Sequence, residues 1–171
     1  MINIDIVFKS KKWKKEEDLD SFITKTCNDL ILLTEIKKII TKDFELELSV
    51  LLMCDSQIRK INSEFRGKDK TTNVLSFPSL DENLVREIGL KKLVGSDKYL
   101  FLGDILISYE TIKKESLAQK KNFRDHLTHL ILHSILHLIG FDHEDEKMAE
   151  EMEALEVKIL KKLRIKNPYI N

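Results

Sequence analysis

The sequence predicts an α+β fold: a mixed sheet of about four strands with helices packed on it, and a metal site at the end of a buried helix. Strand patterns alternate with helical patterns, and the longest helical patterns come last. Only 5 glycines and 2 prolines occur in 171 residues, which disfavours a turn-rich all-β fold. No repeat or linker divides the chain, so one domain is expected over residues 1–171.

Four segments are expected to form strands: residues 2–6, 45–54, 74–77 and 99–108. The third is stopped by Pro78, and the fourth is apolar except for Gly103 and Asp104. A buried carboxylate is costly unless it is paired. Asp104 is therefore expected either to orient a metal-binding imidazole or the attacking water, or simply to belong to a bulge.

Helical patterns occupy much of the remaining chain: residues 16–40 (as one helix or two), 56–65, 109–119, 122–139 and 145–164. Asp55 is the expected N-cap of the second of these helices. Residues 122–139 are apolar nearly all round, which is typical of a helix buried in the core. Gly140 is expected to end that helix at a C′ position with a positive φ. Residues 79–98 have no readable pattern.

The charge balance gives a first limit on function. Lys and Arg number 29, as do Asp and Glu, so no strong overall field for nucleic acid is expected. Local patches remain: residues 59–70 and 158–166 are basic, and residues 142–156 are acidic. No segment is long and apolar enough to span a membrane.

The two cysteines indicate the expected cellular setting. Cys27 and Cys54 are far apart in the chain and form no CxxC pair, so a disulfide framework or a cysteine-rich zinc site is not expected. Cys54 ends an apolar run and is expected to be a small buried residue. Together with the absence of a signal-peptide pattern, these features favour a reducing, cytoplasmic location.

Three histidines form the candidate metal site. His133 and His137 are four residues apart on a predicted helix, which places both rings on one face. Gly140 lets the chain reverse and return His143 to the same place. Three imidazoles with an open fourth position form a catalytic type of zinc site, whereas a structural site is closed by four protein ligands. Three imidazoles also suit nickel, iron or copper.

Neighbouring residues leave several alternatives. His129 continues the i, i+4 row and is therefore a rival ligand, but three ligands along one straight helix surround an ion poorly. If His129 is not a ligand, we expect it either to support the ligands from beside them or to be buried and hydrogen-bonded. His126 is expected to be structural. Asp142 is expected either to act as a general base or to set the loop. Zinc proteases with this ligand spacing carry a glutamate after the first histidine, and Ser134 stands there instead.

The histidine segment resembles a family signature. HSILHLIGFDH, at residues 133–143, is similar to H-G-x-L-H-L-x-G-Y-D-H of the YbeY family, the metal-dependent endoribonucleases of bacterial ribosomal RNA maturation. Ser134 replaces the family's glycine and Phe141 its tyrosine. Neither departure touches a ligand, although Ser134 could narrow the space beside the metal.

Further blocks of the chain extend the resemblance. Residues 58–78 resemble L-N-x-x-Y-R-G-K-D-K-P-T-[DN]-V-L-S-F-P, with Phe65 in place of tyrosine and Thr71 in place of proline. LGDILIS and EEMEALE match a third and a fourth block. Four blocks in the family's order cover roughly residues 45–170.

The resemblance implies a single-strand-specific, metal-dependent endoribonuclease that acts in 16S rRNA 3′-end processing, ribosome maturation and RNA quality control. One divalent ion, expected to be zinc, would activate a water that attacks an RNA phosphodiester. Arg66 and Lys68 are expected to stabilise the phosphate charge. Arg66 matches the family's arginine and is preferred to Arg59; without the resemblance, the same loop is interpreted as a solvated turn.

The expected partner is ribosomal RNA, with the ribosome or a ribosomal protein contributing specificity. Because residues 142–156 are acidic, RNA is expected to approach from residues 59–70. Two other hypotheses remain open on the sequence. One is a non-catalytic, zinc-containing ribosome-assembly factor in which the metal fixes the fold. The other is a different metal-dependent hydrolase, acting on a peptide, a nucleotide or another phosphoester.

Overall fold

The computed structural model describes residues 1–143 and 145–170. In chain order its elements are β1 (Ile2–Phe8), η1 (Lys11–Lys15), α1 (Leu19–Leu33), η2 (Glu35–Lys38), β2 (Glu45–Met53), α2 (Asp55–Arg66), β3 (Val74–Pro78), α3 (Glu82–Ile88), α4 (Leu90–Val94), β4 (Tyr99–Ser108), α5 (Tyr109–Ala118), α6 (Phe123–Leu138) and α7 (Glu146–Lys162). The elements η1 and η2 are short 3-10 helices. The residues predicted as 16–40 thus form one long helix and a separate short turn.

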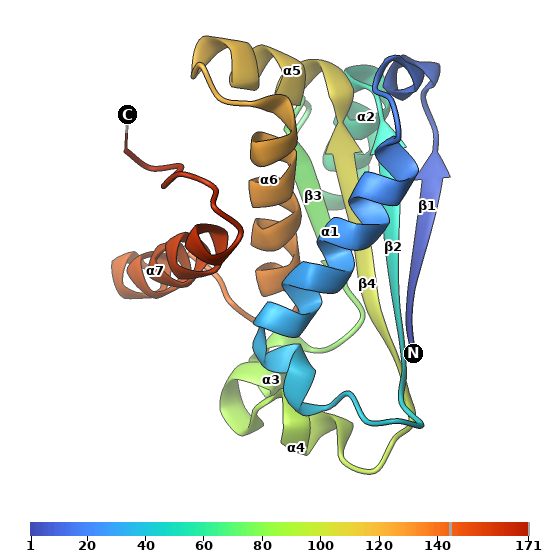
Figure 1. Ribbon diagram of the computed structural model, residues 1–171, viewed down its shortest axis with the longest axis vertical. Helices are drawn as coiled ribbons and strands as arrows, with labels where there is room; N and C mark the ends of the chain where they lie inside the picture. Colours follow the sequence, from blue (N-terminus) through green and yellow to red (C-terminus); the bar gives the residue numbers. More distant parts are fainter. Residues whose placement is uncertain (144, 171) are drawn as a thin grey trace.

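The four strands form one mixed sheet in the order β1-β2-β4-β3 (Figure 1). β1 and β2 pair in parallel, as do β2 and β4, while β3 runs antiparallel to β4. β3 is therefore an edge strand, with hydrogen-bonded neighbours on one side only. The predicted α+β class and the mixed four-stranded sheet are confirmed.

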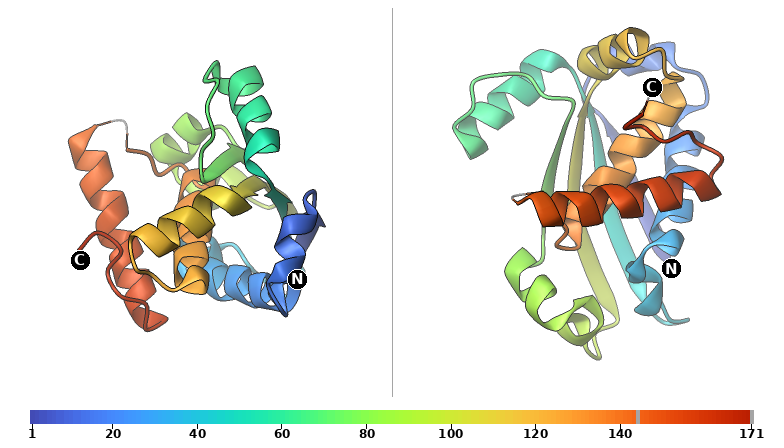
Figure 2. Two further views of the ribbon diagram at one scale, coloured as in Figure 1. Left: turned by 90° about the horizontal axis from the view of Figure 1, so that it is seen from above. Right: turned by 90° about the vertical axis from the view of Figure 1, so that its left-hand side faces the viewer.

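The helices are divided between the two faces of the sheet. α1 and α6 cover one face, and α2 lies on the other (Figures 1 and 2). The side chains of β4 follow this division: Ile105 and Ile107 join the main core, whereas Leu106 joins a smaller cluster with Ile58 of α2. α7 packs against α6 at one side of the molecule (Figure 2).

Two expectations at the start of α2 are wrong. The N-cap is Cys54, and Asp55 is already the first helical residue. The Asp55 carboxylate does not cap its own helix, because it instead accepts hydrogen bonds from the hydroxyls of Ser108 and Thr111. Cys54 is only partly buried, and its sulfur lies 3.2 Å from the Ser56 hydroxyl. Both cysteines are free thiols, as expected.

A bulge interrupts β4 beside the ligand-bearing helix. Glu47 pairs with Phe101 but Ser49 pairs with Asp104, so β4 carries an extra residue here. Gly103 lies within this bulge at φ 140°, and a Cβ there would be 2.3 Å from the Phe77 carbonyl oxygen. Because Gly103 has no side chain, β3 and the C-terminal end of α6 can approach β4 closely.

The segment without a readable pattern forms the short helices α3 and α4. Each helix buries only one or two residues, too few to give a clear apolar period. Along the described residues, no helix has the length and apolar character that crossing a bilayer would require.

Candidate metal centre

α6 positions two of the three histidines. Its N-cap Asn122 accepts hydrogen bonds from the backbone amides of Arg124 and Asp125, and ten of its residues are buried. The core thus fixes the helix on most sides, as the sequence predicted. His133 and His137 lie on the part of its circumference that stays accessible, and both side chains are partly exposed.

The turn after α6 brings back the third histidine. The amide of Gly140 donates to the His137 carbonyl at 3.0 Å, and that of Phe141 donates to the Leu136 carbonyl at 3.0 Å. These two bonds are a Schellman motif, and Gly140 holds the required positive φ of 92°. The expected helix stop is confirmed.

Asp142 holds the returning loop. Its Oδ1 accepts a hydrogen bond from the His143 amide at 2.7 Å, and its Oδ2 lies 3.6 Å from Arg86 of α3. Both carboxylate oxygens therefore have partners within the loop and its support. This arrangement favours the loop-setting interpretation of Asp142 over the general-base interpretation.

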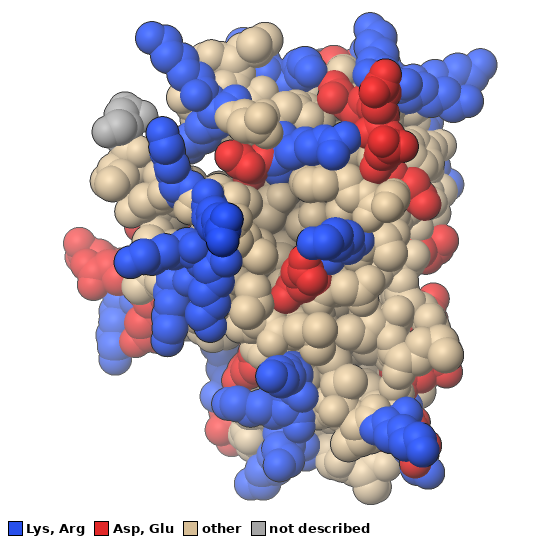
Figure 3. Space-filling model, in the orientation of Figure 1, with Lys and Arg blue, Asp and Glu red and all other residues tan. Residues whose placement is uncertain are grey.

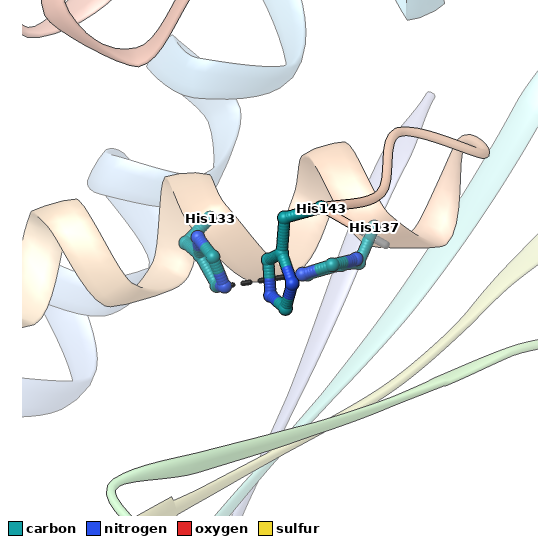
Figure 4. Close-up of side chains that lie close together, drawn as sticks. All are labelled: His133, His137 and His143. Carbon is teal, nitrogen blue, oxygen red and sulfur yellow. Dashed lines mark hydrogen bonds between the residues drawn. The ribbon is translucent and has the colours of Figure 1, made fainter. Parts of the chain in front are cut away.

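The three imidazoles converge on one point (Figure 4). One nitrogen from each of His133, His137 and His143 lies within 4.8 Å of the others. The Nε2 atoms of His133 and His137 are 3.1 Å apart. Two ligands of a tetrahedral zinc ion are separated by about 3.3 Å, from zinc–nitrogen distances of about 2.0 Å. The donor set and its spacing therefore fit one divalent ion of this kind.

A glutamate supports the site from α7. Glu156 is 0% exposed, and its Oε1 accepts a hydrogen bond from the Nδ1–H of His133 at 2.8 Å. This bond fixes the tautomer of His133 and leaves its Nε2 free to bind a metal. The Glu156 Oε2 accepts a hydrogen bond from the Tyr169 hydroxyl. Sequence reasoning missed Glu156 as a functional residue, although it lies within the fourth family block.

The protonation of the site suits metal binding. Burial, reinforced by the neighbouring His133 and His143, lowers the pKa of His137 to about 4, so this imidazole is neutral at pH 7. Burial alone would raise the pKa of Glu156, but hydrogen bonds from His129, His133 and Tyr169 outweigh it and lower the pKa to about 2. A neutral imidazole and a carboxylate that orients its neighbour are the forms that a metal site requires.

The other two histidines of α6 lie outside the cluster. The Nε2 of His129 is 3.5 Å from Glu156 Oε2, so His129 contacts the same carboxylate as His133 and is not among the converging ligands. The Nε2 of His126 lies 2.8 Å from a carboxylate oxygen of Glu115 in α5. His129 thus lies beside the predicted ligands and has polar contacts, but it is partly exposed, so the expectation of a buried histidine is wrong.

Of the two predicted phosphate-binding residues, Arg66 lies at the β3 edge of the sheet. Arg66 ends α2, and its Nη2 donates to the carbonyl of Ser76 in β3 at 3.3 Å. Lys68 follows Gly67 and is exposed. Arg59 forms two hydrogen bonds with Asp69, at 2.8 and 2.9 Å, so its guanidinium is occupied. This difference favours Arg66 over Arg59.

Asp104 lies away from the ligand-bearing helix. It pairs with Phe77 across the strands, and Leu106, two residues further along β4, packs on the α2 side of the sheet. Side chains alternate along a strand, so the Asp104 carboxylate lies on the same face as Leu106, opposite α6. Asp104 thus lies at the bulge in β4, as one of the two interpretations expected. The carboxylate that orients the His133 imidazole is that of Glu156. A catalytic role for Asp104 stays a prediction.

The fold and the site together define an α+β domain with a three-histidine cluster that could hold a metal ion and that is supported by a buried carboxylate. The family model described as Endoribonuclease YbeY matches residues 6–164. The chain is 42% identical over 170 residues to an Endoribonuclease YbeY from Agrobacterium fabrum, covering 98% of this chain and 95% of the relative. A Bartonella henselae relative of the same name is 41% identical over 169 residues, covering 99% and 98%.

The chain therefore belongs to the endoribonuclease YbeY family, whose members are hydrolases acting on RNA. The solution structure of a Thermotoga maritima protein covers 100% of both chains with a TM-score of 0.54 and 22% identity. That likeness shows the shared fold.

Proposed function

We propose that this protein is a zinc-dependent endoribonuclease in which His133, His137 and His143 hold the ion. The observation that carries the proposal is the convergence of three imidazole nitrogens within 4.8 Å, in a chain of the endoribonuclease YbeY family. When bound at such a site, zinc lowers the pKa of a coordinated water to about 7 and so supplies a nucleophile for phosphodiester hydrolysis.

The chain's own residues prepare the centre for this reaction. Glu156 holds His133 in the tautomer that presents Nε2, and the low pKa of His137 keeps that ring unprotonated. Asp142 fixes the backbone of His143. Because three protein ligands leave a fourth position open, the arrangement suits a catalytic ion better than a purely structural one.

The substrate strand is proposed to run along the open edge of β3. β3 is packed against α6, and Arg66 is held at its edge by the Ser76 carbonyl. From this position Arg66 would contact the phosphate, and the exposed Lys68 would add a second positive charge. Acidic residues concentrate in 142–156, so approach from the 59–70 side avoids like-charge repulsion.

The finer biological role rests on the family resemblance. We propose single-strand-specific action on the 3′ end of 16S rRNA, in ribosome maturation and RNA quality control, with the ribosome or a ribosomal protein as partner. The two free thiols support the proposed cytoplasmic setting. Residues 1–171 are proposed to act as one domain, because a single main core joins strands and helices from both halves of the chain.

The test is cleavage of a single-stranded ribosomal RNA fragment by the metal-loaded protein. His133→Ala is expected to lose the metal and the activity, and Arg66→Ala to retain the metal and lose roughly 100-fold in activity. Arg59→Ala is the matched control, because its guanidinium is already paired with Asp69. Unchanged cleavage by both His133→Ala and Arg66→Ala would refute the proposed mechanism.

A further inference from the structure

A cavity lies next to the three-histidine cluster but includes none of its three members. It measures about 750 Å³ and is lined by the C-terminal end of α5, the first turns of α6 and residues 164–170. This volume falls within the range of about 300–1,000 Å³ that is typical of small-molecule sites. His129 lines the cavity but is not one of the ligands, and neither are any of the cavity's other lining residues.

The cavity wall is strongly basic. Four cationic side chains line it, Lys120, Lys121, Arg164 and Lys166, against the single carboxyl group of Asp125. Figure 3 shows blue side chains gathered on the left-hand face, over the C-terminal part of α7 and the segment after it. An anion is therefore the complementary ligand.

Two of these cations occupy strained backbone positions. Among the described residues only Asp18, Lys120 and Arg164 are non-glycine residues with positive φ, and the last two, at 53° and 61°, both line this cavity. Each is the C′ residue of a Schellman motif, at the end of α5 and of α7 respectively. Glycine is the residue that such positions favour. Both cations therefore stand where the backbone conformation carries a cost for any residue other than glycine.

Histidine rings and apolar side chains also line the cavity. The Nε2 of His126 lies 2.8 Å from Glu115, and the Nε2 of His129 lies 3.3 Å from the Tyr169 hydroxyl. Both rings belong to the cavity wall, together with apolar side chains such as Ile165 and Pro168. A small inorganic anion would contact only the cationic side chains, whereas a ligand with both a ring and a phosphate would also contact the histidine rings and the apolar side chains.

We infer that this cavity is a second binding site, which takes a nucleotide through its phosphate group. Lys120 and Arg164 contact the phosphate from the ends of two helices, and the base or ribose lies against Ile165 and the histidine rings. Lys121 closes one side, because its ammonium group donates to the Pro168 carbonyl at 2.7 Å. The nucleotide is either free or part of an RNA strand, since both carry the same phosphate chemistry. This inference does not depend on catalysis at the metal.

The test is calorimetric titration with three probes: inorganic phosphate, 5′-AMP and a 5′-phosphorylated single-stranded oligoribonucleotide. Lys120→Gly and Arg164→Gly each remove one cation while keeping the backbone conformation. Each is expected to weaken binding of 5′-AMP by about tenfold or more, the effect of losing one charge-assisted hydrogen bond. Neither variant is expected to melt earlier than wild type, because glycine suits the positive φ. Tighter binding of the oligonucleotide than of 5′-AMP, lost in the Lys120→Gly, Arg164→Gly double variant, would identify an RNA strand as the source of the phosphate. Equal binding of the two probes, lost in the same variant, would identify a free nucleotide.

Two control variants show whether binding belongs to this cavity. Asp18→Gly relieves the third positive φ outside the cavity and is expected to bind 5′-AMP like wild type. His143→Ala removes a metal ligand and is also expected to bind 5′-AMP normally, so failure of the metal mechanism would leave this result unchanged. The inference is overturned if no probe binds, or if the Lys120→Gly, Arg164→Gly double variant binds 5′-AMP as tightly as wild type.

Discussion

Replacing Glu156 by glutamine tests how the metal centre is held. The change keeps the size of the side chain but removes its charge. The glutamine amide has one oxygen and one NH2 group, so one of the two positions that a carboxylate oxygen now occupies becomes a hydrogen-bond donor. At that position a donor would meet either the Nδ1–H of His133 or the hydroxyl of Tyr169. The Tyr169 hydroxyl can turn to accept a hydrogen bond from the amide, whereas the Nδ1–H of His133 cannot accept one. Each bond to this fully buried group is therefore either lost or replaced by a weaker neutral one.

The expected loss of zinc affinity depends on whether the hydrogen bond to His133 is the one that is weakened. A hydrogen bond to a charged group contributes about 1.5–3 kcal/mol. If the loss falls on the orientation of His133, metal affinity drops by roughly 10- to 100-fold, the usual effect of removing a carboxylate behind a ligand imidazole. The two figures agree, since a tenfold change in affinity corresponds to about 1.4 kcal/mol.

The measurement is competition for zinc with a chromophoric chelator, together with urea unfolding of the metal-free protein. Glu150→Gln is the matched control, because Glu150 lies on the same helix and is exposed. We expect Glu156→Gln to lose both affinity and stability and Glu150→Gln to lose neither. Wild-type zinc affinity in Glu156→Gln would refute the reasoning that this carboxylate positions His133.

Three further predictions concern the scaffold. Gly103→Ala should lower the free energy of unfolding by about 3 kcal/mol or more in urea titration, because the new Cβ would lie 2.3 Å from the Phe77 carbonyl oxygen. Gly89→Ala is the control: Gly89 also has a positive φ, but its new Cβ would meet nothing within 4 Å, so its free energy of unfolding should fall much less. Chelation of the metal should lower Tm by only about 5–10 °C, because the core holds α6 in place without the ion. This is the effect of losing a ligand present at roughly 100 times its Kd. Complete unfolding on chelation would instead indicate a structural metal. Partial burial alone would raise the pKa of Asp55, but hydrogen bonds from Ser108 and Thr111 lower it below its usual value. The stability that it contributes is therefore present above about pH 4 and is lost as the pH falls through the folded-state pKa; Asp55→Asn should be less stable than wild type at pH 7, and a stability gap that stays constant down to pH 2 would contradict this.

The convergence of the three histidines could be predicted because it depends on local geometry. The spacing of His133 and His137 on a helix, and the turn at Gly140, are properties of a short stretch of chain. No contact with a distant part of the chain is needed to bring His143 close to the other two histidines. Helix periodicity and the glycine at position 140 were therefore sufficient to predict that the three residues lie together. The same holds for the burial of α6, which its continuous apolar surface already indicated.

Glu156 could not be assigned in the same way, because its role depends on how α7 crosses α6. A signal was nevertheless present: Glu156 stands between Met152 and Ile159 on the buried face of an amphipathic helix. A carboxylate at a core position requires a partner, and a search for that partner leads to the histidines. The position of Asp104 was harder, because the bulge in β4 depends on pairing with distant strands.

The cap of α2 shows how tertiary contacts override a local preference. Asp55 has the side chain that commonly caps a helix. In the fold, Ser108 and Thr111 lie within hydrogen-bond distance of its carboxylate, so the helix begins one residue earlier than its sequence suggests. The short helices α3 and α4 lacked a signal because little of their surface is buried.

The hydrogen bond from Arg66 to the Ser76 carbonyl has a consequence for association between molecules. An unpaired strand edge can template pairing with another chain and so promote aggregation. β3 spans only five residues and ends at Pro78, and Arg66 occupies one of its outward carbonyl groups with a charged side chain. The residue proposed to contact RNA therefore also protects the β3 edge from pairing with another chain, so a substitution there is expected to reduce solubility as well as activity.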